Sequence, residues 1–161
     1  MAKRVHKIAS IALVALILGA LGMMFLPLLS MATVGDEAVL FGGATLLFGG
    51  DIVAELPSGI YAFHFDVNIP ILIITQAYLL GAVSCFLGTQ SKFNRIFSML
   101  LLLTGSVAMF FLPEMVIPTS TLTREGLGFA YGLYLCVGFA AASFTGQLVE
   151  LILLFRKGKQ A

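Results

Sequence analysis

Four long apolar stretches, separated by short polar segments, constrain the fold of this chain most strongly. They cover residues 8–29, 69–87, 96–112 and 127–155. A helix needs about 20 residues to cross about 30 Å of hydrocarbon. The third stretch reaches this length only if it continues past Pro113, and the fourth is long enough to tilt or protrude. The chain is 60% hydrophobic with a mean hydropathy of +1.06, too apolar for a water-soluble domain of this length. We therefore expect an all-α membrane protein, a single domain over residues 1–161 built as a four-transmembrane-helix bundle.

The charges divide between the two sides of such a bundle. Basic residues lie before the first stretch, between the second and third, and after the fourth: Lys3, Arg4, Lys7, Lys92, Arg95, Arg156, Lys157 and Lys159. Acidic residues lie in the other connections, where Arg124 is the one base: Asp36, Glu37, Asp51, Glu55, Asp66, Glu114 and Glu125. Cytoplasmic loops of membrane proteins carry an excess of Lys and Arg. This predicts cytoplasmic termini, a cytoplasmic turn at 88–95, a cytoplasmic tail at 156–161 and external segments at 31–68 and 113–126, in a plasma or cytoplasmic membrane.

The first stretch also resembles a secretory signal peptide, because Ser30-Met31-Ala32 would suit cleavage. Signal-peptide cores contain 7–15 apolar residues. The first stretch is longer, so an uncleaved helix is the favoured interpretation.

The external segment 31–68 is rich in β-prone runs. Runs at 38–41, 44–48, 51–56 and 60–67 are separated by Gly-Gly, Gly-Gly and Pro-Ser-Gly. Gly-Gly between apolar runs is a hairpin signal, since glycine adopts positive φ readily. We expect one small extracellular antiparallel sheet on the outer end of the bundle. The alternative is that residues 40–53 form a re-entrant or interfacial segment.

The last of these runs alternates between two faces, as in a half-buried strand. Tyr61, Phe63, Phe65 and Val67 point one way, and Ala62, His64, Asp66 and Asn68 the other. Asn68 is expected to cap the helix at 69–87, with Pro70 in its first turn. The candidate partner surface of this run consists of Tyr61, Phe63, His64, Phe65 and Asp66.

His64 and Asp66 share one strand face, and together with Asp51 or Glu55 they could bind a metal. No spacing supplies the remaining ligands, so a solvated polar face is favoured. We predict no metal site, no cofactor and no catalytic residue, because the chain contains no hydrolase, metalloprotease or nucleotide-binding motif. Cys85 and Cys136 lie in apolar stretches and are expected to be packing residues.

Small residues recur at four-residue spacing in the apolar stretches, which allows helices to approach closely. The candidate packing residues are Gly128, Gly132, Gly138, Ala142, Gly146, Ala77 and Gly81. They would serve packing within the bundle or, alternatively, dimerisation.

Polar residues inside apolar stretches mark candidate functional sites. A candidate polar path consists of Glu150, Gln147, Ser143, Gln76 and Thr104. Glu150 is the one charged residue inside the four apolar stretches. It would act in proton or cation movement or, as the favoured alternative, pair with Arg95, Arg4 or Lys7 near the inner interface.

Several motifs resemble the superfamily of claudins, epithelial membrane proteins and peripheral myelin protein. They are Gly128-Phe129-Ala130-Tyr131, Gly146, the run Leu153 to Lys157, and Ser91-Lys92-Phe93. The resemblance implies a tetraspan architecture, with a fifth strand at 117–123 in which Thr119, Thr121 and Thr123 alternate. This chain lacks the tryptophan signature and external cysteine pair of that superfamily.

These observations favour a non-catalytic membrane protein with a structural, adhesion or complex-assembly role. Its partners would be the lipid bilayer and a membrane-protein partner or further copies of itself, and no feature suggests nucleic-acid binding. The first alternative is a small transporter or channel that uses the polar path. A membrane enzyme acting on lipids or quinones through Glu150 or His64 is the weakest.

Overall fold

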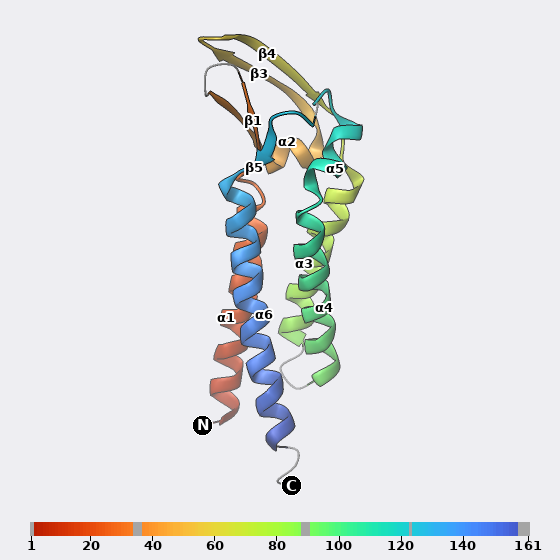
Figure 1. Cartoon of the computed structure of the whole chain (residues 1–161). Coiled ribbons are helices and arrows are strands. Elements are labelled where there is room, and N and C mark those ends of the chain that lie inside the picture. The colour runs from red at the N-terminus through yellow and green to blue at the C-terminus, as the bar shows by residue number, and fades with distance from the viewer. Residues whose placement is uncertain (1, 34–36, 88–90, 123, 158–161) are drawn as a thin grey trace.

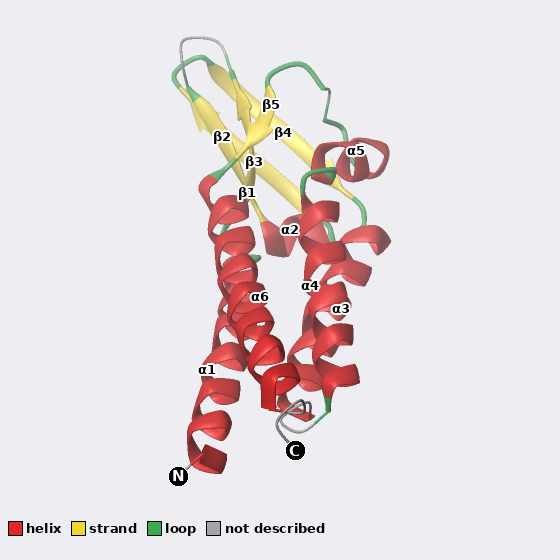
Figure 2. Cartoon of the chain, turned by 60° about the horizontal axis from the view of Figure 1, so that its bottom comes forward, coloured by secondary structure: helices red, strands yellow, loops and turns green. Residues whose placement is uncertain are grey.

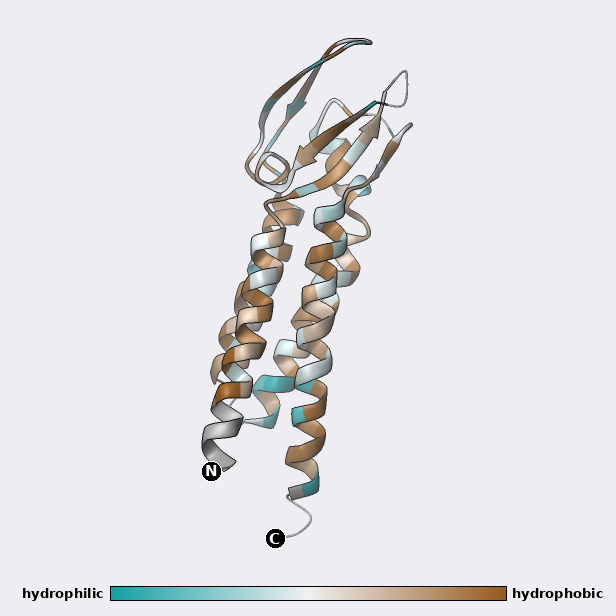
Figure 3. Ribbon diagram, turned by 90° about the vertical axis from the view of Figure 1, so that its left-hand side faces the viewer, coloured by the Kyte–Doolittle hydropathy of each residue, from teal (hydrophilic) through white to brown (hydrophobic). Residues whose placement is uncertain are grey.

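The computed structural model describes residues 2–33, 37–87, 91–122 and 124–157. Four long helices run side by side, and two small β-sheets lie together at one end, opposite both termini (Figure 1). The long helices are α1 (Ala2–Met23), α3 (Ile69–Leu87), α4 (Lys92–Met109) and α6 (Tyr131–Lys157). Hydrophobic residues dominate the helical half, with hydrophilic patches toward the end that carries the termini (Figure 3).

The expectation of four membrane-spanning helices is wrong. Two of the described helices, α3 and α6, are long and apolar enough to cross a membrane. A third candidate exists only if α4 is joined to the segment Leu112–Thr119, across a 75° bend. That segment consists of helix α5 (Leu112–Val116) and the 3₁₀ turn η1 (Ile117–Thr119). The apolar part of α1, Ile8–Met23, is shorter than a span requires.

Pro27 explains why the first helix ends at Met23, before the end of the predicted range 8–29. The residue before a proline disfavours helical backbone, and proline offers no N–H to continue the helix. Strand β1 (Pro27–Ala32) follows, and its Leu28 and Leu29 are fully buried. The last apolar residues of this stretch therefore belong to the protein core rather than to a membrane helix.

The strands form two small antiparallel sheets, which corrects both the all-α class and the single expected sheet (Figure 2). One sheet has the order β2-β1-β5 and the other is the hairpin β3-β4. Their bounds are Ala38–Gly42 for β2, Gly50–Leu56 for β3, Gly59–Phe65 for β4 and Leu127–Phe129 for β5. Strand β5 takes the first residues of the predicted range 127–155, because Leu29 of β1 pairs with Phe129.

Residues 44–48 were expected to form a strand but lie in the short helix α2 (Gly43–Phe48). Gly43 marks a crossing of two chain segments rather than a hairpin. Its N–H donates to the Leu26 carbonyl (3.1 Å), and a Cβ at this position would lie 1.5 Å from the Met24 oxygen. Only glycine fits such a close approach of two backbones.

The expected fifth strand does not form over the described residues 117–122, because residues 117–119 form the 3₁₀ turn η1. Ser120 makes a single antiparallel bridge to Phe65, and Thr123 lies outside the described residues. Residues 88–90 of the predicted turn 88–95 and residues 158–161 of the predicted tail also lie outside them. Helix α4 already begins within that turn, at Lys92, where the Ser91 hydroxyl accepts from the Asn94 N–H (3.4 Å).

The predicted cap of the second stretch is confirmed. Helix α3 covers 69–87, and the Asn68 side-chain oxygen accepts from the Ile71 N–H (3.0 Å). The Asn68 amide also donates to the Met115 carbonyl (2.7 Å). Asn68 therefore ties the start of α3 to α5.

Candidate functional site

The hairpin β3-β4 has a buried face and an exposed face. Its turn is Pro57-Ser58, so Leu56 pairs with Gly59. On the buried face, the Phe63 and Phe65 rings lie 5.2 and 5.4 Å from the Phe41 ring, measured between centroids. Three members of the predicted partner surface, Tyr61, Phe63 and Phe65, thus pack onto the neighbouring sheet, and Tyr61 is only half-buried.

We call the exposed side of the hairpin its outer face. It consists of three cross-strand pairs: Asp51 with His64, Val53 with Ala62, and Glu55 with Ile60. All six side chains are exposed, including Val53 (63%) and Ile60 (73%). Sequence reasoning offered Asp51 and Glu55 beside His64 only as candidate metal ligands, and it missed Val53 and Ile60 as surface residues. The alternation of 51, 53 and 55 across a two-residue turn was the available signal.

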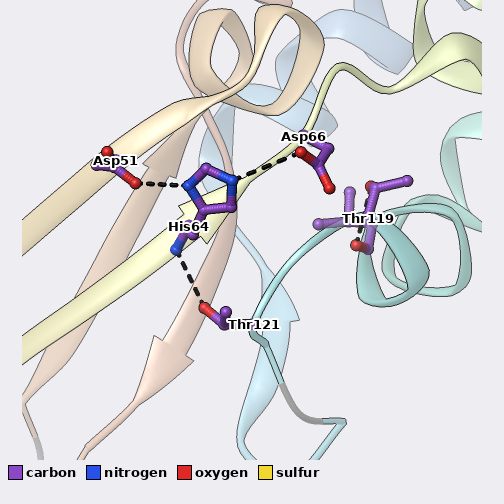
Figure 4. A network of polar contacts seen from close by, with 6 residues as sticks. Asp51, His64, Asp66, Thr119 and Thr121 are labelled. Atoms are coloured by element: carbon purple, nitrogen blue, oxygen red, sulfur yellow. Dashed lines mark hydrogen bonds and ion pairs between the residues drawn. The ribbon is translucent and has the colours of Figure 1, made fainter.

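His64 lies between two carboxylates on this face (Figure 4). Its Nδ1 is 2.6 Å from Asp51 Oδ1, and its Nε2 is 3.5 Å from Asp66 Oδ1. The hydrogen bond and charge of Asp51 raise the His64 pKa above its ordinary value, and Asp66 adds a smaller contribution. A protonated imidazole donates through both nitrogens, so it suits both neighbours.

This arrangement does not form a metal site. The two aspartates lie at opposite nitrogens of the ring, so they do not converge with it on one ion. No group of three or more metal-capable side chains occurs among the residues that the structure describes.

The outer edge of strand β4 is covered by the segment after α5. His64 N–H donates to the Thr121 hydroxyl (3.0 Å), and Thr121 N–H donates to the His64 carbonyl (3.1 Å) (Figure 4). Asp66 N–H donates to the Thr119 carbonyl (2.7 Å). The hairpin is therefore attached to the segment that joins α4 to α6.

A second group of polar residues is buried among α1, α4 and α6. We call Ser10, Arg95, Ser143, Gln147 and Glu150 the polar cluster. Arg95 forms an ion pair with Glu150 and donates to the Ser10 hydroxyl (3.1 Å). Ser143 donates to the Leu13 carbonyl (3.1 Å). Of the three bases offered by the sequence, Arg95 is thus the partner that the structure shows for Glu150.

The predicted polar path is brought together only in part. Ser143, Gln147 and Glu150 are buried on one side of α6, and the Gln147 amide lies 3.4 Å from the Ser143 hydroxyl. Gln76 and Thr104 are exposed on α3 and α4 and point away from this cluster. Periodicity alone could not decide which face of each helix turns inward.

The candidate packing residues also divide. Gly132 and Gly146 approach other segments closely, since an added Cβ would lie 2.5 Å from the Pro27 oxygen and 2.4 Å from a Leu13 methyl. Gly81 is buried and Ala77 is half-buried. Gly138 and Ala142 are exposed, and Gly128 lies in β5 rather than in a helix.

A groove of about 280 Å³ lies between α4 and α6. Its lining is apolar apart from Ser106 and Thr145. Those hydroxyls are engaged with Tyr78 (3.0 Å) and with the Ala141 carbonyl (2.9 Å). The groove therefore offers few polar groups to orient a ligand.

Comparisons of the chain with protein-family models, curated protein sequences and solved structures find no match.

Proposed function

We propose that this chain is a non-catalytic membrane protein that assembles with a protein partner through the outer face of its β3-β4 hairpin. The exposure of Val53 and Ile60 within one small, ordered face carries the proposal. Val53, Ala62 and Ile60 are neighbours on this face and are bordered by Asp51, Glu55 and His64. Contiguous apolar patches with a polar rim mark protein interaction sites. The hairpin that carries the outer face is fixed to the rest of the molecule. Its buried face packs on Phe41, and its β4 edge is hydrogen-bonded to Thr121.

In this proposal, α3 and α6 cross the bilayer and the sheets lie on its outer side. The charge pattern supports cytoplasmic termini, because the basic residues Lys92 and Arg156 lie at the helical end, and the described acidic residues other than Glu150 lie on the sheets and their connections. A plasma or cytoplasmic membrane fits this orientation. A relationship to claudins and peripheral myelin protein is a hypothesis supported only by the motifs named above.

The alternative role as a transporter is disfavoured. Gln76 and Thr104 do not join the polar cluster, and the Glu150 carboxylate is already paired with Arg95. The five residues of the candidate polar path therefore do not form one continuous route.

Photo-cross-linking in native membranes tests the proposal. A photoreactive amino acid at Val53 or Ile60 should give one discrete adduct, whereas the same group at Glu125 should not. Glu125 is an exposed acidic residue outside the hairpin. Sizing in mild detergent should show a defined complex. A strictly monomeric protein without adducts at positions 53 and 60 would contradict the proposal.

A further inference from the structure

The hydrogen-bonding pattern of the hairpin shows which backbone groups lie at its free edge. Both backbone groups of His64 are directed toward Thr121, away from β3. Its cross-strand neighbour Asp51 is therefore at a non-hydrogen-bonded position and directs its own N–H and C=O away from β4. By alternation, Val53 and Glu55 do the same.

This edge of β3 has no strand beside it in the described parts of the chain, where β3 and β4 form a two-stranded sheet. The same three residues thus present both backbone groups at the edge and side chains on the outer face. The row of side chains reads acidic, apolar, acidic. A strand added here would form main-chain hydrogen bonds and place alternate side chains beside this row.

The charges of the row select the partner. If a second copy paired antiparallel about Val53, Asp51 would lie opposite Glu55 at both ends of the contact. Like charges directly opposite each other destabilise a strand pair. The one base of the external connections, Arg124, is already paired with Glu114 (2.8 Å), so a second copy offers no free base there.

We propose that the β3 edge binds an extended segment of another protein that carries basic, apolar and basic residues at alternate positions. The basic side chains would face Glu55 and Asp51, the latter already paired with His64 through its Oδ1, and the apolar side chain would cover Val53. The residues between them would lie beside the half-buried Ile52 and Ala54. This inference rests on the proposed function and specifies the chemistry of its partner.

Synthetic peptides test this with the full chain in nanodiscs of zwitterionic lipid, which do not attract cationic peptides. The probe is a seven-residue strand peptide with lysines two positions on either side of a central valine. Its control carries glutamates instead. The lysine peptide should bind on the order of tenfold more tightly, because each exposed ion pair contributes a few-fold and each like-charge pair opposes binding. Equal affinity for the two peptides would overturn the inference.

Two variants of the chain locate the binding. Glu55→Lys should reduce the preference for the lysine peptide severalfold, whereas Glu125→Lys should leave it unchanged. Val53→Pro removes an N–H at the free edge but no hydrogen bond of the hairpin, and proline is tolerated at such an edge position. It should abolish binding while hydrogen exchange over residues 50–65 stays protected.

If Val53→Pro unfolds the hairpin, the peptide is changed instead of the protein. A lysine peptide methylated on its backbone nitrogens lacks the N–H groups that would pair with the edge of β3. Methylation should abolish binding, and unchanged binding would overturn the inference. A discrete cross-linked adduct at Val53 together with equal binding of both peptides would refute the inference of a basic strand but leave the proposed function standing. Absence of both adduct and preference would refute the proposed function as well.

Discussion

The imidazole of His64 couples the hairpin to pH. Its pKa is raised above the ordinary value of 6.5, chiefly by Asp51. The contribution of the charged imidazole to stability is therefore fully present below pH 6.5 and is lost as pH rises through the raised pKa. We expect amide protection in residues 50–65 to decrease over that interval, measured by hydrogen exchange.

The variant His64→Asn provides the control for this pH dependence. It keeps a polar side chain on the outer face but does not titrate, so protection of the hairpin should stay nearly constant across the same interval. A pH-dependent loss of the same size in the variant would assign the effect to other groups.

The ion pair between Arg95 and Glu150 is a second feature at the level of single residues. Both side chains are buried, so Glu150→Gln leaves a guanidinium without its carboxylate. We expect the free energy of unfolding to fall by about 3–5 kcal/mol. The double variant Arg95→Met, Glu150→Leu should lose less than Glu150→Gln, because no charge stays buried alone.

Unfolding of the detergent-solubilised protein measures these losses. Thr104→Val is the matched control, since Thr104 is exposed on α4, and it should change stability by less than about 0.5 kcal/mol. If Glu150→Gln costs as little as this control, the ion pair does not stabilise the helical half.

At the level of elements, two glycines of α6 test which face of that helix is packed. An added Cβ at Gly132 would meet backbone at 2.5 Å, whereas nothing lies within 4 Å of one at Gly138. Gly132→Ala should destabilise by about 1–3 kcal/mol through overpacking. Gly138→Ala should stabilise by up to about 1 kcal/mol, because alanine favours helix.

Thermal unfolding in detergent compares the two variants. Because both variants make the same Gly→Ala change in the same helix, most of the effect of helix propensity cancels when their stabilities are compared. If both variants behave alike, the orientation of α6 against β1 is wrong. A marked loss in Gly138→Ala alone would instead point to a lateral contact on the exposed row.

Sequence patterns predicted individual elements where local residues decide them. The helix at 69–87 and the alternation of residues 61–65 are confirmed, since a cap and a two-residue period are local properties. The strand β1 and the helix α2 were missed. The apolar run at 27–32 and the Gly-Gly pair at 42–43 are each compatible with several local structures, and long-range pairing selects one of them.

At the level of the whole molecule, the charge distribution predicts its orientation in the membrane. Ser58→Cys at the hairpin turn should react with an impermeant thiol reagent in intact cells. Lys92→Cys at the start of α4 should react only after the cells are opened. The natural cysteines Cys85 and Cys136 are buried, so they give a low background. Labelling of residue 92 in intact cells would contradict the proposed orientation.

The candidate site shows the same division between local and long-range information. Alternation singled out His64 and Asp66, and Glu55 was offered beside them, but Val53 and Ile60 emerged only when the register of the hairpin was known. Likewise, Glu150 stood out as an ionisable residue in an apolar stretch. Its pairing with Arg95 depends on how α4 packs against α6, while the side chains of Arg4 and Lys7 lie outside those that the structure describes.

The sequence by itself determined the apolar character of the chain, the helix α3 and the separation of acidic from basic segments, because each depends on composition and neighbouring residues. Only the tertiary structure decided that Leu28 and Leu29 are core residues of a sheet. Their strand pairs with β5, about 100 residues away in the chain. No local pattern records such a contact, since its stability comes from burial shared between distant segments.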